Sequence, residues 1–134
     1  NHSKNERVNF LQLWVLPKKK DIEPRYAQKT FDPINRKNTF QLVVAPDNTE
    51  ALWINQDAWF SLGDIEKDIS QTYSVHKSGH GVYIFVIDGA IEIDGHQLDQ
   101  RDAIGIEEAE KVNIKAALDS KLLLIEVPMI KSDF

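Results

Sequence analysis

Histidine is the residue type in this chain best suited to metal binding or acid–base chemistry, and the four are His2, His76, His80 and His96. A non-haem metal site on a β-barrel needs two or three histidines and a carboxylate, and ligands from one strand are spaced by two so that they share a face. His76 and His80 are four residues apart, but the loop-like residues 77–79 separate them. We expect both to lie in a loop near a barrel mouth, and the alternative that they are a pair of ligands stays open.

The remaining candidates for chemistry favour ordinary structural roles. His96 follows a hairpin glycine and is expected to be exposed, and His2 lies in the polar residues 1–7, which indicate a linker. The carboxylates of residues 107–110 are typical of a charged, solvated turn. The sequence contains no GxSxG elbow, no phosphate-binding glycine loop and no cysteine. These absences argue against serine hydrolases and nucleotide-binding loops, and they exclude thiol catalysis and disulfides.

The chain has enough aromatic and amide side chains to line a ligand pocket. Trp14, Trp53 and Trp59 could do so, but strands supply inward-facing aromatic residues mainly for core packing, and we expect that role for them. Gln56 lies close to a predicted strand and could offer a hydrogen bond. If this domain has a pocket of its own, the candidate residues are His76, His80, Gln56 and Trp53.

Strands must position these side chains, and residues 81–106 carry the clearest strand pattern. Apolar residues occupy both alternating faces of residues 82–87, which predicts a central strand buried on both sides. Residues 91–94 then alternate between isoleucine and acidic residues, as in a strand with one face toward water. Asp88-Gly89 and Asp94-Gly95 each predict a hairpin, because glycine tolerates positive φ.

Further β-rich runs predict additional strands over residues 8–16, 39–44, 52–55, 58–62, 69–75, 112–116 and 122–127. Residues 17–38 contain three prolines without a sustained period and predict an extended excursion. No stretch carries the pattern of a long amphipathic helix. Many short strands at regular spacing predict an all-β fold, as a sandwich, jelly roll or barrel.

Length and composition predict one globular domain of 134 residues, 42% of them hydrophobic. The net charge of −5 argues against general affinity for nucleic acid, and no apolar run reaches the roughly 18 residues of a membrane span. Without cysteine or a signal-type segment, we expect a cytoplasmic protein. Residues 18–37 are basic, which predicts a solvated loop, with a partner-binding patch as the alternative.

A succession of short motifs resembles one protein family. The motifs are Phe10-Leu11-Gln12-Leu13-Trp14 with Pro17, Pro24, Tyr26, Gln28 and Phe31, then Val43-Val44-Ala45-Pro46-Asp47, Gln56-Asp57-Ala58, Gly81-Val82-Tyr83, Val86-Ile87-Asp88-Gly89 with Asp94-Gly95, Asp102-Ala103, and Leu123-Leu124-Ile125-Glu126-Val127-Pro128. Each motif is short, but their order covers nearly the whole chain. It resembles the second half of the pirin-type proteins.

The resemblance implies a cupin jelly-roll β-barrel that is one half of a bicupin. It also implies that the N-terminal cupin holds a single Fe(II)-type metal through three histidines and a glutamate. Some bacterial members resemble quercetin 2,3-dioxygenases in activity, and others are cofactors of transcription. By this resemblance, residues 1–134 are a single C-terminal cupin domain, with residues 1–7 as residual inter-domain linker, and the N-terminal barrel is missing. The start at Asn1, without methionine, agrees with a fragment or processed product.

The sequence departs from the ligand pattern of metal-binding cupins. That pattern has His-x-His, then a glutamate, then a glycine seven positions later. Anchoring it on Gly89 puts Val82 at the glutamate and residue 77 or 78 at the second histidine, so that His76 alone coincides with a ligand. The second motif needs a later histidine, and none occurs after His96. We therefore expect no metal and no catalytic residue in this domain, and Fe(II) or a similar divalent metal in the missing N-terminal cupin.

The expected role is a metal-free domain that packs against its own N-terminal cupin, through residues 10–15, and supports it. We expect no enzymatic activity from the fragment alone, whereas the full-length protein is a candidate quercetin 2,3-dioxygenase. One alternative is a ligand-binding or enzymatic module that uses His76, His80 and Gln56. Another is a transcription-cofactor-type interaction module that uses residues 18–37. An apolar face left by the missing barrel would favour a homodimer, and neither nucleic acid nor membrane is an expected partner.

Overall fold

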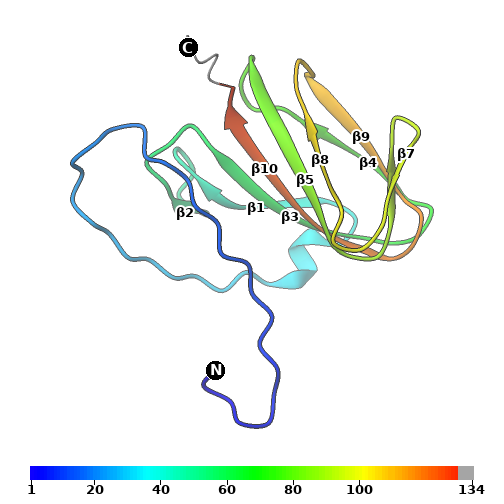
Figure 1. Ribbon diagram of the computed structural model, residues 1–134, viewed down its shortest axis with the longest axis horizontal. Coiled ribbons are helices and arrows are strands. Elements are labelled where there is room, and N and C mark those ends of the chain that lie inside the picture. The colour runs from blue at the N-terminus through cyan, green and yellow to red at the C-terminus, as the bar shows by residue number, and fades with distance from the viewer. Residues whose placement is uncertain (130–134) are drawn as a thin grey trace.

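Two β-sheets pack face to face in the computed structural model, which describes residues 1–129 (Figure 1). The larger sheet has the strand order β2-β1-β3-β10-β5-β8, and the smaller has the order β4-β9-β6-β7. The strands are β1 (Phe40–Ala45), β2 (Leu52–Trp53), β3 (Trp59–Ile65), β4 (Ser70–Ser74), β5 (His80–Asp88), β6 (Ile91–Ile93), β7 (His96–Leu98), β8 (Ala103–Ile106), β9 (Lys111–Ala116) and β10 (Ser120–Pro128). The described residues add one short 3-10 helix, η1 (Pro33–Arg36). The expected all-β fold is confirmed.

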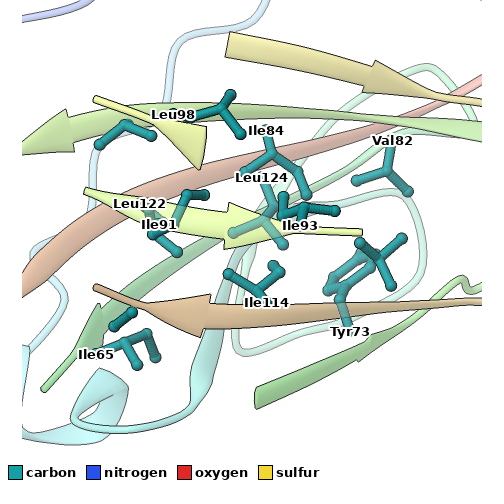
Figure 2. Close-up of a cluster of buried hydrophobic side chains, with 13 residues drawn as sticks. Ile65, Tyr73, Val82, Ile84, Ile91, Ile93, Leu98, Ile114, Leu122 and Leu124 are labelled. Carbon is teal, nitrogen blue, oxygen red and sulfur yellow. The ribbon is translucent and has the colours of Figure 1, made fainter. Parts of the chain in front are cut away.

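The main core lies between the sheets and follows from the alternation of apolar and polar residues along each strand. In β9 every second residue is buried, beginning with Val112, and the residues between them face water. Ile84 and Leu124 from the larger sheet meet Ile91 and Ile114 from the smaller one, and all four are fully buried (Figure 2). Both sheets therefore contribute to one hydrophobic layer, as in a β-sandwich.

Strand β10 is the last strand of residues 1–129 but lies at the centre of the larger sheet. It pairs antiparallel with β3 on one side and with β5 on the other, so that Leu123 lies opposite both Leu62 and Phe85. Alternation along β10 turns Leu122, Leu124 and Glu126 toward the interior. The position of a carboxylate on this face is central to the site described below.

The two Asp-Gly pairs have different structural roles. Asp94-Gly95 forms the expected hairpin between β6 and β7, with φ of 48° and 78°, the signs of a type I′ turn. The prediction of a hairpin at Asp88-Gly89 is wrong, because β5 pairs with β8 and β10 whereas β6 pairs with β7 and β9. Gly89, at φ 89°, is instead the corner at which the chain passes from one sheet to the other.

Strand β5 is central in the larger sheet, between β10 and β8, but it is not buried on both faces as expected. Val82, Ile84 and Val86 are buried against the core. Tyr83 points to the outer face of the sheet and is exposed. The outer face of β5 is therefore open to solvent at Tyr83.

The N-terminal residues 8–31, which we call the strap, run outside both sheets (Figure 1). The prediction of a strand over residues 8–16 is wrong, because this segment pairs with no strand in the described structure. The predicted excursion over residues 17–38 is confirmed apart from η1. Val15 and Phe31 anchor the strap by packing on a small cluster of Val43, Ala58 and Phe60, on the outer side of the larger sheet.

Residues 18–30 are all exposed, as expected for a solvated loop, but three basic residues of the segment 18–37 also form ion pairs with the rest of the domain. Lys18 Nζ lies 2.9 Å from Asp57 Oδ1, Arg36 Nε lies 3.0 Å from Asp64 Oδ2, and Lys37 also pairs with a glutamate of the barrel. Partly exposed pairs of this kind each contribute about 0–1 kcal/mol. Among residues 1–129, no helix has the length and apolar character needed to cross a membrane.

Candidate functional site

Glu126 is a carboxylate with no exposed surface, on the inner face of β10. Its neighbours across the sheet are Trp59 on β3 and Val82 on β5. Removing an ionised carboxylate from water costs several kcal/mol unless charged or hydrogen-bonding partners replace the water. The groups that replace water around Glu126 therefore define the site.

Four donors surround this carboxylate and come from β4 and from the loop that follows it. Tyr73 Oη donates to Oε2 over 2.9 Å, and His76 Nδ1 lies 2.8 Å from the same oxygen. The backbone N–H of His76 reaches both oxygens at 2.9 and 3.0 Å, and that of Lys77 reaches Oε1 at 3.1 Å. A carboxylate offers about four acceptor positions. Glu126 is therefore saturated, and it joins the larger sheet to the loop after β4.

The ionisation of this cluster follows from its surroundings. Burial raises the pKa of Glu126, but hydrogen bonds from the His76 backbone, the His76 ring and the Tyr73 hydroxyl outweigh it and hold the pKa below its usual value. Burial, followed by the charge of Glu126, raises the pKa of Tyr73, which keeps its hydroxyl protonated as a donor. With Glu126 ionised, His76 carries its proton on Nδ1 to complete the hydrogen bond.

The expectation that both histidines lie in a loop is correct for His76 but wrong for His80, which is the first residue of β5 and approaches the same carboxylate without forming a hydrogen bond. The side chain is 5% exposed, and Nδ1 lies 3.1 Å from Glu126 Oε1. This distance suits an ion pair, but the orientation is wrong for a hydrogen bond, and Nδ1 has no partner among the described residues. Trp59 stacks on His76 with ring centroids 5.0 Å apart and lies tilted against His80. Aromatic packing thus fixes both imidazoles beside Glu126.

The structure brings two of the four pocket candidates together and places the other two elsewhere. His76 and His80 share Glu126, whereas Gln56 and Trp53 line a surface hollow of about 600 Å³ beside the strap. Gln56 Nε2 donates to the carbonyl oxygen of Leu16 over 2.9 Å. Trp53 lies under the guanidinium of Arg25, at 5.2 Å. The four residues therefore do not form one pocket.

The expectation that the tryptophans pack in the core is confirmed for Trp59 and wrong for Trp14 and Trp53. Trp59 is buried, but Trp14 and Trp53 are exposed, because Trp14 lies in the strap and Trp53 lies on β2, the short strand at the edge of the larger sheet. His2, His96 and the glutamates of residues 107–110 are exposed, as expected.

A metal ion of the cupin type does not fit the residues present. Within residues 1–129, no three histidine, cysteine or acidic side chains are arranged to hold a metal. His76, at a cupin ligand position, has its Nδ1 engaged by Glu126, and the carboxylate has no acceptor position left. Val82, at the position of the cupin glutamate, is buried in the core.

Sequence reasoning missed Glu126 and Tyr73 as members of the site. A signal for Glu126 is present in the sequence, because it is the acidic residue in an otherwise apolar run and shares an alternating face with Leu122 and Leu124. A carboxylate on a core face needs buried donors. Tyr73 carries no comparable signal, since an inward tyrosine on a strand is common in cores that contain no carboxylate.

We expect acid to destabilise this domain through Glu126. Its pKa in the folded state is below the ordinary 4.5, so its contribution to the free energy of unfolding is complete above about pH 4.5. As the pH falls further, the unfolded chain takes up the proton first. The contribution of Glu126 therefore decreases as the pH falls, and it is fully lost once the pH is below the folded-state pKa. Urea unfolding measured between pH 7 and pH 3 should show this decline.

Glu126→Gln is the matched control, because it removes the titration while retaining the side-chain volume. Asp57 also titrates in acid, with its pKa lowered to about 2 by hydrogen bonds from Lys77 and Lys18. Since Asp57 is present in both proteins, the difference between their stability curves isolates Glu126. Parallel curves for the two proteins would contradict the prediction.

Comparison with known proteins identifies the family. The family described as the quercetinase C-terminal cupin domain matches residues 42–127. The chain is 30% identical to a quercetin 2,3-dioxygenase of Escherichia coli strain K12 over 131 residues, which cover 97% of this chain and 55% of that protein. It is 28% identical to a pirin-like protein of Caulobacter vibrioides over 123 residues, or 90% of this chain and 53% of that one. The chain spans about half the length of the curated relatives it matches.

Solved structures give the same result. The crystal structure of YhhW from Escherichia coli matches with a TM-score of 0.80 and 28% identity, over 89% of this chain and 50% of that chain. The structure of the bacterial pirin YhhW in complex with nickel(II) matches with a TM-score of 0.79 and 28% identity, over 87% of this chain and 49% of that chain. Because the family match covers most of residues 1–134, the chain belongs to the quercetinase C-terminal cupin domains of the pirin-type proteins.

Proposed function

We propose that this domain is a metal-free half of a pirin-type protein that packs against an N-terminal cupin and supports it. In this proposal the N-terminal cupin holds Fe(II) or a similar divalent ion and carries a quercetinase-like dioxygenase activity. The observation that carries the proposal is the saturation of Glu126 by four donors within its own barrel. In this proposal Glu126 and His76 have a structural role, because they hold the loop after β4 against β10.

The geometry supports a structural role for Glu126 and argues against a weak metal site. A cation at Glu126 would have to displace the backbone N–H groups of His76 and Lys77, which would then be left without an acceptor. It would also have to break the contact of Glu126 with His76 Nδ1, at 2.8 Å. The cluster thus stabilises the loop that closes this end of the barrel, and its loss would expose the core.

The exposed apolar side chains of the strap support a docking role. Phe10, Trp14, Leu16 and Tyr26 are all highly exposed. Exposed apolar patches of this kind mark protein interaction sites. The curated relatives are about twice as long as this chain, which is enough additional sequence for one further barrel of similar size.

Separate production of this domain and of the N-terminal half tests the proposal. We expect the halves to associate one to one in analytical ultracentrifugation, and iron to co-purify with the N-terminal half. At a concentration of this domain about 100-fold above Kd, the N-terminal half should gain about 2.7 kcal/mol in free energy of unfolding. Quercetin turnover should require the N-terminal half. Tight iron binding by this domain that is lost in His76→Ala would overturn the metal-free role. Ultracentrifugation of this domain alone is the control, because it shows whether the domain dimerises by itself.

One observation favours a second function, the binding of a small polar ligand. The buried His80 lines a hollow of about 520 Å³ together with residues of the segments 74–79 and 108–111. Its Nδ1 is buried 3.1 Å from Glu126 Oε1, so the opposite edge of the ring is the part left for a ligand. Binding of quercetin by this domain alone, measured by isothermal titration calorimetry and abolished in His80→Ala, would favour this function. The interaction module in segment 18–37 gains less support, since Lys18, Arg36 and Lys37 already pair with acidic residues of the barrel.

A further inference from the structure

The hollow at the barrel mouth is bordered by two loops. Residues 75–79 connect β4 to β5, and residues 107–110 connect β8 to β9. The backbone N–H of Val75 donates to the carbonyl oxygen of Glu110 over 2.9 Å, which holds the two loops together. The hollow that they border has a volume of about 520 Å³. This volume lies within the range of small-molecule sites in proteins.

The imidazole of His80 is the buried polar group of this hollow. It is 5% exposed, and its Nδ1, 3.1 Å from Glu126 Oε1, has no hydrogen-bond partner among residues 1–129. Because Glu126 is ionised, a proton on Nδ1 is favoured over a lone pair, which would face a negatively charged oxygen. The neutral ring then has no proton on Nε2. The nitrogen that His80 offers to a ligand is therefore an acceptor.

The side chains around the hollow carry more negative than positive charge. Glu108, Glu110 and Lys111 all line it and are exposed. Among residues 1–129, none of the three belongs to an ion pair. A negatively charged ligand would meet two carboxylates here and a third, Glu126, behind His80. The charge of the hollow therefore favours a cation.

The remaining lining residues favour an organic cation over a metal ion. Val75 and Ala109 are half-buried and offer apolar contact to a carbon chain. Ser74 and Ser78 add hydroxyl groups, which accept hydrogen bonds. Within the described part of the chain, no three histidine, cysteine or acidic side chains are placed to hold a metal. A primary amine on a short carbon chain fits these groups, because its ammonium group is positively charged and donates three hydrogen bonds.

We propose that this hollow binds a small organic amine, whose ammonium group donates to Nε2 of His80 and is attracted by Glu108 and Glu110. The proposal rests on the second function proposed above and names its ligand class. Glu126 would act as a positioning residue, since its charge keeps the proton of His80 on Nδ1. The N-terminal cupin is not required, because this chain supplies every residue of the hollow.

Titration of this domain with 1,4-diaminobutane, followed by proton–nitrogen correlation NMR, tests the proposal. The amide shifts should saturate and should be confined to residues 74–80 and 107–111. 1,4-Butanediol and succinate also have four carbons but carry no positive charge, and they should bind about tenfold more weakly or worse. Equal binding of the diol, tighter binding of succinate, or the absence of any shift with the diamine would each overturn the proposal.

The quercetin titration described above separates this proposal from the function on which it rests. If quercetin binds and its binding is lost in His80→Ala, while the diamine does not bind, the ligand class is wrong and the second function stands. If neither compound binds, the second function fails as well.

The ring nitrogens of His80 give an independent measurement. At pH 8 a primary amine is still protonated. In a long-range proton–nitrogen spectrum at this pH, Nε2 should give the signal of an unprotonated nitrogen, and this signal should move when the diamine is added. A proton on Nε2, or an Nε2 signal that does not respond to the diamine, would overturn the role of this nitrogen as the acceptor.

Substitutions at the hollow distinguish a site from general attraction to a chain of net charge −5. Glu108→Gln and Glu110→Gln each remove one exposed charge at constant volume and should weaken diamine binding about two- to fivefold. His80→Phe retains a ring beside Trp59 but removes the acceptor, and should weaken binding about tenfold or more. Glu92→Gln is the matched control, since Glu92 is exposed on β6 and does not line the hollow. Equal weakening by Glu92→Gln and the two hollow glutamines would contradict the proposal, even if His80→Phe fails to fold.

Discussion

Glu126→Leu is expected to lower the free energy of unfolding by on the order of 3–5 kcal/mol. Leucine fills a similar volume but accepts no hydrogen bond. The substitution therefore leaves the backbone N–H groups of His76 and Lys77, the hydroxyl of Tyr73 and the ring of His76 without their acceptor. Each buried donor left without a partner costs about 1–3 kcal/mol, although the loop can recover part of this by opening to water.

Urea unfolding at pH 7, followed by tryptophan fluorescence, measures this loss directly. Trp59 is a suitable reporter because it is buried beside Glu126 and pairs with it across the sheet. Glu92→Leu is the matched control, since Glu92 lies within β6 but faces water. Its effect should stay within about 0.5 kcal/mol. A loss below about 1 kcal/mol in Glu126→Leu would show that the carboxylate does not hold the loop.

Gly89→Ala is expected to cost about 2–5 kcal/mol, because it combines backbone strain with a steric clash. At φ 89° an L-residue is strained, and the added methyl group would meet the carbonyl oxygen of Asp119. It would also lie 2.5 Å from Ser120 Oγ and 2.7 Å from Ser120 Cα. Relief would require moving the first residue of β10, the central strand of the larger sheet.

Gly95→Ala separates the two causes of this loss. Gly95 has a similar positive φ of 78°, but no atom lies within 4 Å of an added methyl group there. Its cost should be limited to the backbone strain of about 1–2 kcal/mol. Equal losses at both positions in the same unfolding experiment would rule out the clash at the corner.

The strands from residue 39 onward could be predicted from sequence, because alternation reports which residues face a core. The same reasoning failed at residues 8–16. Their composition indicates that they suit a strand, but it does not reveal whether another strand is available to pair with them. At Asp88-Gly89 the dipeptide indicated positive φ correctly. It carried no information on which sheet the next strand joins, so the corner was mistaken for a hairpin.

The candidate site could be predicted only in part for a related reason. The loop-like residues 77–79 predict that His76 and His80 lie near a barrel mouth, but the group that joins them, Glu126, lies 46 residues beyond His80. The basic segment shows the same limit, because Lys18 pairs with Asp57, 39 residues away. Composition shows that a segment carries charge, whereas the fold decides which opposite charge it meets.

The central position of β10 has a consequence for the order in which the chain can fold during synthesis. Until residues 120–128 have left the ribosome, β3 and β5 have no strand between them, and the larger sheet exists as two separate parts with open edges. Such edges attract other chains. A nascent chain of this domain must therefore keep the apolar strands made before β10 from pairing wrongly until residues 120–128 emerge, and chaperone binding should be strongest on chains that stop just before residue 120.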